Sequence, residues 1–208
     1  MKTIAIIGGT GKLGTGLAVR WAIAGEDVII GSRSLEKAEK TAEILSEKYR
    51  IELRGLRNED VARLADVIVL TIPYEAIHDT MNMISSKIRG DAKIISPIVS
   101  PNPSKGNSSA ELVKRLAPIG VQVAAAFQTL PYKPLPEIDK EIVADILVFG
   151  EEIAKEEAIR LAHEIPGVRA IDAGGLEDSW IVEAMTHLII SLNKKYRRKA
   201  MTIKLIGL

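Results

Sequence analysis

The 208-residue chain is 47% apolar and 26% charged, which is typical of an ordered globular protein of one domain or slightly more. Its 28 basic and 27 acidic side chains nearly cancel, which argues against a dedicated nucleic-acid or membrane-surface binder, because such proteins carry excess positive charge. The absence of cysteine and the wide spacing of the three histidines exclude disulfides, thiolate chemistry and a histidine metal pair. No apolar run suits a signal peptide or a membrane span, so a cytoplasmic location is expected.

The first fifty residues contain two strand and helix units. Residues 3–7 form a β-branched apolar run that ends at a glycine, which predicts a strand buried on both faces. Apolar residues at helical spacing follow and end at Gly25. A second strand is predicted over 27–31 and a second helix over 35–49.

The rest of the chain continues this alternation. Further strands are predicted over 67–70, 93–95, 121–126 and 142–149, and helices over 75–88, 109–116 and 151–165. A long helix follows Gly174-Gly175, carries an apolar stripe and leads into the basic run 194–199. The pattern predicts an α/β fold: a Rossmann-type doubly wound parallel sheet with a small C-terminal α/β extension that ends in this helix. The expected domain boundary lies near Gly150, between a Rossmann domain (1–150) and a small C-terminal domain (151–208).

A glycine motif stands between the first strand and the first helix. Its sequence, Gly9-Thr10-Gly11-Lys12-Leu13-Gly14, has the G-x-G-x-x-G pattern of dinucleotide-binding sites. The first glycine permits a tight turn, the second lets backbone approach a pyrophosphate, and the third allows close packing of helix on strand. Backbone N–H groups at the helix N-terminus would bind the anion. We predict a dinucleotide site here, with a plain glycine-rich turn as the alternative.

The end of the second strand indicates which dinucleotide binds. An NAD site places an acidic residue there to bind the ribose hydroxyl, whereas this chain has Ser32-Arg33-Ser34. A guanidinium and a hydroxyl can bind the 2′-phosphate of NADP, which a carboxylate would repel. If Ser34 caps the second helix, the charge of Lys37 opposes the helix dipole, which a bound phosphate would explain. We therefore predict NADP, with Thr10 adding a hydroxyl; otherwise Arg33 and Lys37 are solvated surface charges.

Three apolar, proline-containing segments follow predicted strands. They are Thr71-Ile72-Pro73-Tyr74, Ser96-Pro97-Ile98-Val99 and Phe127-Gln128-Thr129-Leu130-Pro131. Such walls suit a flat second redox ring beside the nicotinamide, because direct hydride transfer needs close approach and exclusion of water more than acid–base groups. None of the tyrosines begins the Tyr-x-x-x-Lys pair of short-chain reductases. We therefore expect no catalytic acid–base residue and no metal site.

Taken together, these motifs resemble the coenzyme F420-dependent NADP oxidoreductases of archaea. The resemblance rests on residues 8–14, 31–33, 36–39, 58–60, 70–73, 96–97 and 172–174 and on the apolar C-terminal end. It implies reversible hydride transfer between C5 of the deazaflavin F420 and C4 of NADP, commonly in a homodimer. It also implies contacts to the 2′-phosphate from Thr10, Ser32, Arg33 and Lys37. The deazaflavin pocket that it implies comprises Ser96, Pro97, Ile98, Val99, Leu130, Pro131 and Leu208.

Two features depart from this family pattern. The segment 98–109 is shorter than in family members, and Gln128 stands where they tend to have histidine. Both border the expected second ring, so two other functions stay open: an NADPH-dependent flavin or ferric reductase, and a non-catalytic NADPH-binding sensor. The basic run 194–199 is expected either to complement the helix dipole or to attract the acidic tail of F420.

Overall fold

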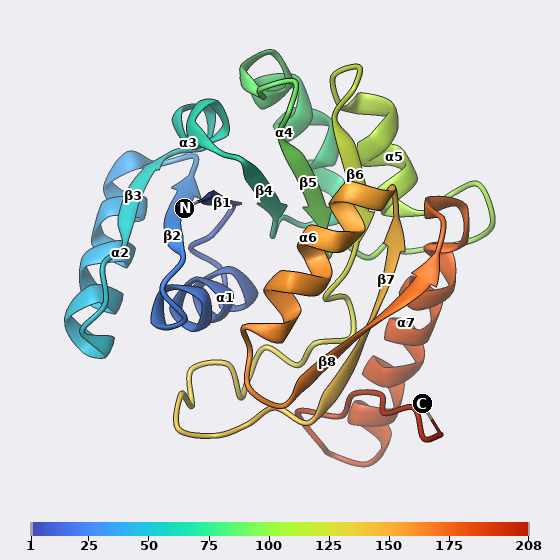
Figure 1. The fold of residues 1–208 in the computed structure, drawn as a ribbon. Helices are drawn as coiled ribbons and strands as arrows, with labels where there is room; N and C mark the ends of the chain where they lie inside the picture. Colours follow the sequence, from blue (N-terminus) through green and yellow to red (C-terminus); the bar gives the residue numbers. More distant parts are fainter. Residues whose placement is uncertain (1, 208) are drawn as a thin grey trace.

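The computed structural model describes residues 2–207 and arranges their strands in one eight-stranded sheet covered by helices (Figure 1). The strand order is β3-β2-β1-β4-β5-β6-β7-β8. Neighbouring strands run parallel, except that β7 is antiparallel to β6. The predicted α/β class, a Rossmann-type doubly wound parallel sheet, is confirmed, and the one antiparallel pair was not predicted.

The elements follow the predicted alternation closely. The strands are β1 (Thr3–Ile7), β2 (Asp27–Ser32), β3 (Arg54–Arg57), β4 (Val67–Leu70), β5 (Lys93–Ser96), β6 (Gln122–Ala125), β7 (Ala144–Gly150) and β8 (Val168–Gly174). The helices are α1 (Lys12–Ile23), α2 (Leu35–Tyr49), α3 (Asn58–Leu64), α4 (Ile77–Ile84), α5 (Ser109–Leu116), α6 (Glu152–His163) and α7 (Trp180–Lys195). The predicted helix over 75–88 is divided, because 3-10 turns over Tyr74–Ala76 and Ser85–Lys87 flank α4.

Three elements have no counterpart among the sequence predictions: β3, α3 and β8. Strand β3 reads Arg-Gly-Leu-Arg, lies at the edge of the sheet and leaves its two arginines exposed, so it lacks the apolar run of a buried strand. Helix α3 has only seven residues. Strand β8 forms the other edge and is largely half-buried or exposed. Short or edge elements carry weak periodicity, and the sequence therefore did not reveal them.

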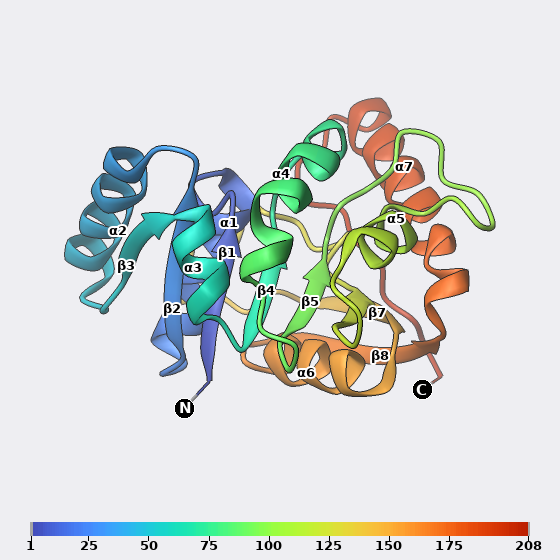
Figure 2. The same ribbon diagram turned by 90° about the horizontal axis from the view of Figure 1, so that it is seen from above.

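Helices cover both faces of the sheet (Figure 2). Apolar side chains of α1, α2 and α6 pack in one core on one face, and those of α3, α4 and α5 pack in a second core on the other. A third, smaller cluster joins α5 and α7 to β6 and β7. Strand β1 lies between β2 and β4, and the connections into these two strands, through α1 and α3, pass over opposite faces of the sheet, which opens a crevice at the carboxyl end of β1.

The antiparallel strand β7 extends past the edge of the sheet formed by the carboxyl ends of the parallel strands. In the pairing of β6 with β7, Ala125 lies opposite Phe149, so the first residues of β7 extend past the end of β6. The connection over 126–143 contains no helix. A parallel return to the sheet would need a long crossover, usually through a helix, which is consistent with the antiparallel direction of β7. Buried Arg20 on α1 fixes this connection by donating to the backbone carbonyls of Leu135 and Glu137 among others.

Helix α7 places its apolar stripe differently from an ordinary core helix. Ile181 and Leu188, two members of the predicted stripe, are exposed, whereas Val182, Glu183 and Thr186 form its buried face. A buried glutamate on that face has a specific role, which is described below. No helix within residues 2–207 is both long and apolar enough to cross a membrane.

The C-terminal tail is attached to β7 and β8 through Asp145, a fully buried carboxylate. Arg169 Nη2 donates to its Oδ2 at 2.7 Å, and the backbone N–H of Leu205 and the ammonium of Lys204 also contact it. Hydrogen bonding to Arg169 lowers the pKa of Asp145 to about 2, against the opposing effect of burial. The tail is therefore held by a carboxylate that stays ionised.

We expect Asp145→Asn to lower the free energy of unfolding at pH 7 by about 2 kcal/mol, because a native pKa near 2 against 3.8 unfolded favours the folded state by that amount. A depressed pKa stabilises above pH 4, and this stabilisation is lost as the pH falls from about 4 towards 2. Urea unfolding at several pH values should therefore show that the difference in unfolding free energy between the unmodified protein and Asp145→Asn becomes smaller as the pH falls. Asp91→Asn, which removes an exposed ion pair with Arg89, should have a much smaller effect. A pH-independent difference would contradict the assignment.

Candidate functional site

The glycine turn is shaped by close backbone contacts at the carboxyl end of β1. Gly8 has a φ of +71°, and the N–H of Gly9 donates to the carbonyl of Gly31 at 2.9 Å, which ties the turn to β2. A Cβ at Gly14 would lie 2.7 Å from Gly9 Cα, whereas one at Gly11 would meet only the carbonyl oxygen of Gly8, at 3.6 Å. The third glycine is thus required by packing, and the second leaves space beside the turn.

Helix α1 begins directly after this turn with no side-chain cap. Its N-cap is Gly11, and no acidic residue lies in its first turn. The first N–H groups of a helix have no partner within the helix and form the positive end of its dipole. The helix N-terminus is therefore available to an anion at the edge of the sheet.

The end of β2 supplies hydroxyls and cations. Ser32 is buried, whereas Arg33 and Lys37 are exposed. Ser34 is the N-cap of α2, and its hydroxyl accepts a hydrogen bond from the N–H of Lys37 at 3.3 Å, so the condition set in the sequence analysis is met. Lys37 consequently lies in the first turn of α2, where a positive charge opposes the helix dipole.

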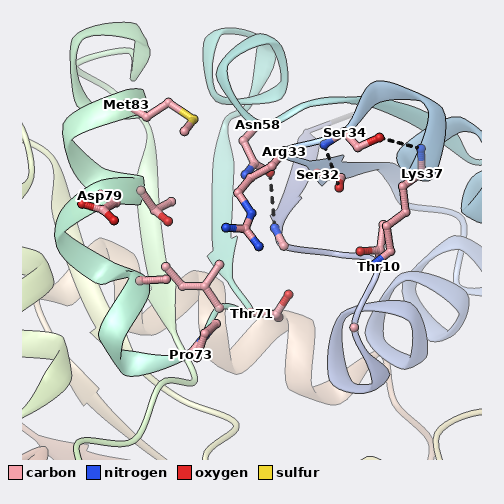
Figure 3. Close-up of a pocket in the computed structure, with 15 residues that line it drawn as sticks. Thr10, Ser32, Arg33, Ser34, Lys37, Asn58, Thr71, Pro73, Asp79 and Met83 are labelled. Atoms are coloured by element: carbon pink, nitrogen blue, oxygen red, sulfur yellow. Dashed lines mark hydrogen bonds between the residues drawn. The ribbon is translucent and has the colours of Figure 1, made fainter.

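These groups meet at one cavity of about 610 Å³ (Figure 3). Figure 3 shows Arg33 and Lys37 beside the cavity from the β2 side, with Asp79 and Met83 of α4 on the opposite wall. The lining residues that the sequence predicted as cofactor contacts are Thr10, Gly11, Ser32, Arg33, Lys37, Thr71, Ile72 and Pro73. The structure thus brings together the glycine turn, the end of β2 and the segment after β4.

Further lining residues were missed by the sequence interpretation. They are Gly8, Ser34, Asn58, Ala76, Asp79, Thr80 and Met83. The buried side chain of Asn58 accepts a hydrogen bond from the N–H of Gly8 at 3.3 Å, so it links the start of α3 to the glycine turn. Residues 58–60 had contributed to the family resemblance, but no local pattern assigned Asn58 a contact. The three residues of α4 came to the site only through the folding of that helix across the crevice.

The other predicted cofactor residues lie outside the lining of this cavity. Gly9, Leu13 and Gly14 shape the turn and its packing, and the ammonium of Lys12 lies 5.5 Å from the ring centre of Tyr132. Leu208 lies outside the described residues. The remaining predicted residues form two segments, Ser96-Pro97-Ile98-Val99 after β5 and Leu130-Pro131 after β6.

These two segments are held next to each other at the carboxyl edge. The amide Nε2 of Gln128 donates to the carbonyl of Ser96 at 3.0 Å, and the carbonyl of Ser96 also accepts from the N–H of Ala126. Pro97, Ile98 and Leu130 are buried. The C-terminal tail reaches the same place, where the hydroxyl of Thr202 donates to the carbonyl of Thr129 at 2.9 Å. The structure therefore confirms that both segments share one edge of the sheet.

Buried polar atoms in these segments lack partners among the described residues. They are Ser96 Oγ, Gln128 Oε1 and Thr129 Oγ1. An unsatisfied buried polar group costs about 1–3 kcal/mol, so such atoms call for an explanation, and a ligand that hydrogen-bonds to them supplies one. Phe127, next to Gln128, has a φ of +71°, an unusual conformation for a bulky residue and one that concentrates at functional sites.

Comparison with known proteins adds independent information. The family described as NADP oxidoreductase, coenzyme F420-dependent, matches residues 3–100. The F420-dependent NADP reductase of Methanocaldococcus jannaschii is 38% identical, over 99% of this chain and 98% of its own. The F420-dependent NADP reductase of Methanothermobacter thermautotrophicus is 39% identical, over 99% of this chain and 95% of its own. A crystal structure assigned to an F420-dependent NADP reductase from Arthrobacter has a TM-score of 0.83 at 19% identity, covers both chains fully and supports the fold.

The match to the curated relatives extends through both the glycine turn and the C-terminal helix and tail. Identity of this level over nearly the whole of each chain leaves no large segment of this protein without a counterpart. This chain therefore belongs to the F420-dependent NADP reductase family.

Proposed function

We propose that this protein catalyses reversible hydride transfer between NADP(H) and the deazaflavin coenzyme F420. The observation that carries the proposal is the single cavity that joins the glycine turn to Arg33 and Lys37. The curated relatives are named F420-dependent NADP reductases, which supports both members of the substrate pair. The enzyme is accordingly an NADP-dependent oxidoreductase.

The cavity fits NADP better than NAD. Arg33, Lys37 and Ser32 would hold the 2′-phosphate, with Thr10 of the turn adding a hydroxyl, because cations and hydroxyls make charge-assisted bonds to phosphate oxygens. The acidic residue in the lining, Asp79, lies on α4 across the cavity from them (Figure 3). The N-terminus of α1 beside Gly11 would receive the pyrophosphate.

The segments after β5 and β6 suit the second ring. Val99 and Pro131 are partly exposed and would offer apolar surface to the ring, and Pro97, Ile98 and Leu130 behind them are buried. The unpartnered Ser96 Oγ and Gln128 Oε1 can hydrogen-bond to the polar edge of a heterocycle. This combination supports an acceptor that is flat, aromatic and polar along one edge, with the C-terminal end next to it.

Catalysis on this surface would work by positioning. The bound nicotinamide and deazaflavin supply the redox chemistry, with hydride passing between C4 and C5. Among the described residues that line the cavity, the ionisable ones are Arg33, Lys37 and Asp79, of which the first two are assigned to phosphate. The remaining contribution of the chain is to hold two rings in contact and exclude water, and we assign no acid–base residue.

Parallel assays of NADPH oxidation with F420, FMN, FAD and ferric chelate test the proposal. F420 should be reduced with a kcat/KM at least about tenfold above that of either flavin, because its pocket would match the deazaflavin. Turnover of flavin or ferric chelate without F420 would instead identify a flavin or ferric reductase. Tight binding of NADPH with no turnover of any acceptor would identify a sensor.

Arg33→Glu should raise the KM for NADP about tenfold or more. A charge-assisted phosphate contact contributes about 1.5–3 kcal/mol, and the reversed charge adds repulsion. Lys40→Glu is the matched control, because it reverses a charge on the exposed side of α2 outside the cavity lining. Steady-state kinetics with NADP and NAD should show a large rise in the KM for NADP in Arg33→Glu and none in Lys40→Glu. Equal use of NAD and NADP by the unmodified enzyme would refute the phosphate assignment.

We also propose that the chain forms a homodimer through the exposed side of α7 and the tail. Leu188 and Ile190 are each 58% exposed and Ile206 is 97% exposed, so α7 and the tail leave apolar side chains uncovered that a subunit contact would cover. Light scattering should give twice the 22.6 kDa chain mass. Leu188→Glu combined with Ile190→Glu should yield monomers, whereas Ile44→Glu on the exposed side of α2 should not. A monomeric unmodified protein at assay concentration would contradict the proposal.

A further inference from the structure

Helix α7 carries a carboxylate in the interior of the protein. Glu183 is 0% exposed and lies on the buried face of the helix with Val182 and Thr186. A carboxylate removed from water is costly unless other groups satisfy it. None of the ion pairs formed by residues 2–207 includes Glu183. Its stabilisation must therefore come from uncharged donors.

Those donors come from the connection that follows β5 and from the first turn of α5. Glu183 Oε2 accepts from the N–H of Ser100 at 2.8 Å. Its Oε1 accepts from the N–H of Ser109 at 2.9 Å and lies 2.7 Å from the Ser109 hydroxyl. Burial raises the pKa of Glu183, whereas these hydrogen bonds oppose the rise. One side chain thus holds both ends of the segment 100–109.

Neighbouring contacts extend the same attachment. His187, one turn further along α7, has Nε2 2.7 Å from the carbonyl of Ser100. At the start of α7, the Ser179 hydroxyl donates to that of Ser108, the N-cap of α5, at 2.7 Å. The hydroxyl of Ser109 also lies 2.6 Å from the carbonyl of Ile98. Helix α7 therefore contacts the backbone of Ser100 directly, at both its N–H and its carbonyl.

Residues 96–99 are the wall on which the acceptor ring is proposed to lie. Ser100 follows Val99 directly, so its bond to Glu183 fixes the backbone next to this wall. We infer that Glu183 is a positioning residue for the hydride acceptor: by binding the backbone at Ser100 and Ser109, it holds the 96–99 wall in place. This inference rests on the proposed function for the identity of the acceptor, but the attachment itself does not.

Glu183→Gln tests the inference, because it keeps the side-chain volume but presents an amide NH2 to one of two backbone donors. Glu157→Gln is the matched control. Glu157 is a second buried glutamate, on α6 at the amino edge of the sheet, and it is satisfied by Arg160 and Lys2. Both changes should lower stability, so stability alone does not distinguish positioning from a general structural role.

Kinetics and hydrogen exchange on the full chain provide the discriminating readouts. Glu183→Gln should raise the KM for F420 at least about fivefold while the KM for NADPH changes less than about twofold, and Glu157→Gln should change neither. Without any ligand, the amides of Ser100 and Ser109 should exchange at least about tenfold faster in Glu183→Gln than in Glu157→Gln. Should Glu183→Gln not fold, Ser109→Ala removes one contact and should shift the same quantities less.

Unchanged exchange at Ser100 and Ser109, or faster exchange with an unchanged KM for the acceptor, would overturn the inference. Turnover of a flavin in place of F420 would overturn the proposed function alone, and the KM would then be measured for that flavin. No turnover with any acceptor would overturn both.

Discussion

The close approach of α1 to β1 is the constraint on which the rest of the site depends. Any side chain at position 14 would collide with the backbone of Gly9, and Gly9 is in turn bonded to the carbonyl of Gly31. Asn58 adds a third attachment through the N–H of Gly8. The glycine turn, the end of β2 and the start of α3 are therefore fixed relative to one another before any ligand arrives. A phosphate-binding surface preorganised in this way loses little conformational entropy on binding.

Charge placement around this turn runs against the stability of the apoprotein. Lys37 lies at the positive end of the α2 dipole, and Arg33 is close enough to share the same cavity. Neither position is one that helix electrostatics would favour. A dianionic phosphate reverses the sign of both interactions, so charges that are unfavourable without ligand become favourable with it. On the proposal that these groups hold the 2′-phosphate of NADP, binding rather than folding accounts for these two side chains.

The proposed binding surface for the second ring is assembled from segments far apart in the chain. The antiparallel β7 extends the sheet beyond the ends of β5 and β6, and Asp145 attaches the tail there. The loop after β6 is fixed by Arg20, and the loop after β5 by Glu183 of α7. Three buried charged side chains thus stabilise backbone that has no regular structure of its own. A wall that must be both irregular in shape and stationary requires such attachments, since regular hydrogen bonding does not supply them.

Local sequence determined the first half of the site and only the composition of the second. The glycine spacing, the β-branched strand before it and Ser34 at the start of α2 are short-range features, so they predicted the turn, the cap and the position of Lys37. The sequence also indicated that residues 96–99 and 130–131 follow strands. It did not show that β7 reverses direction, that α7 buries Glu183 in place of its apolar stripe, or that Asn58 and Asp79 reach the cavity. These depend on which strands become neighbours and which face of a helix meets them. Contacts between residues some 80 positions apart, such as Glu183 with Ser100, are set by global packing and leave no periodic trace in the sequence.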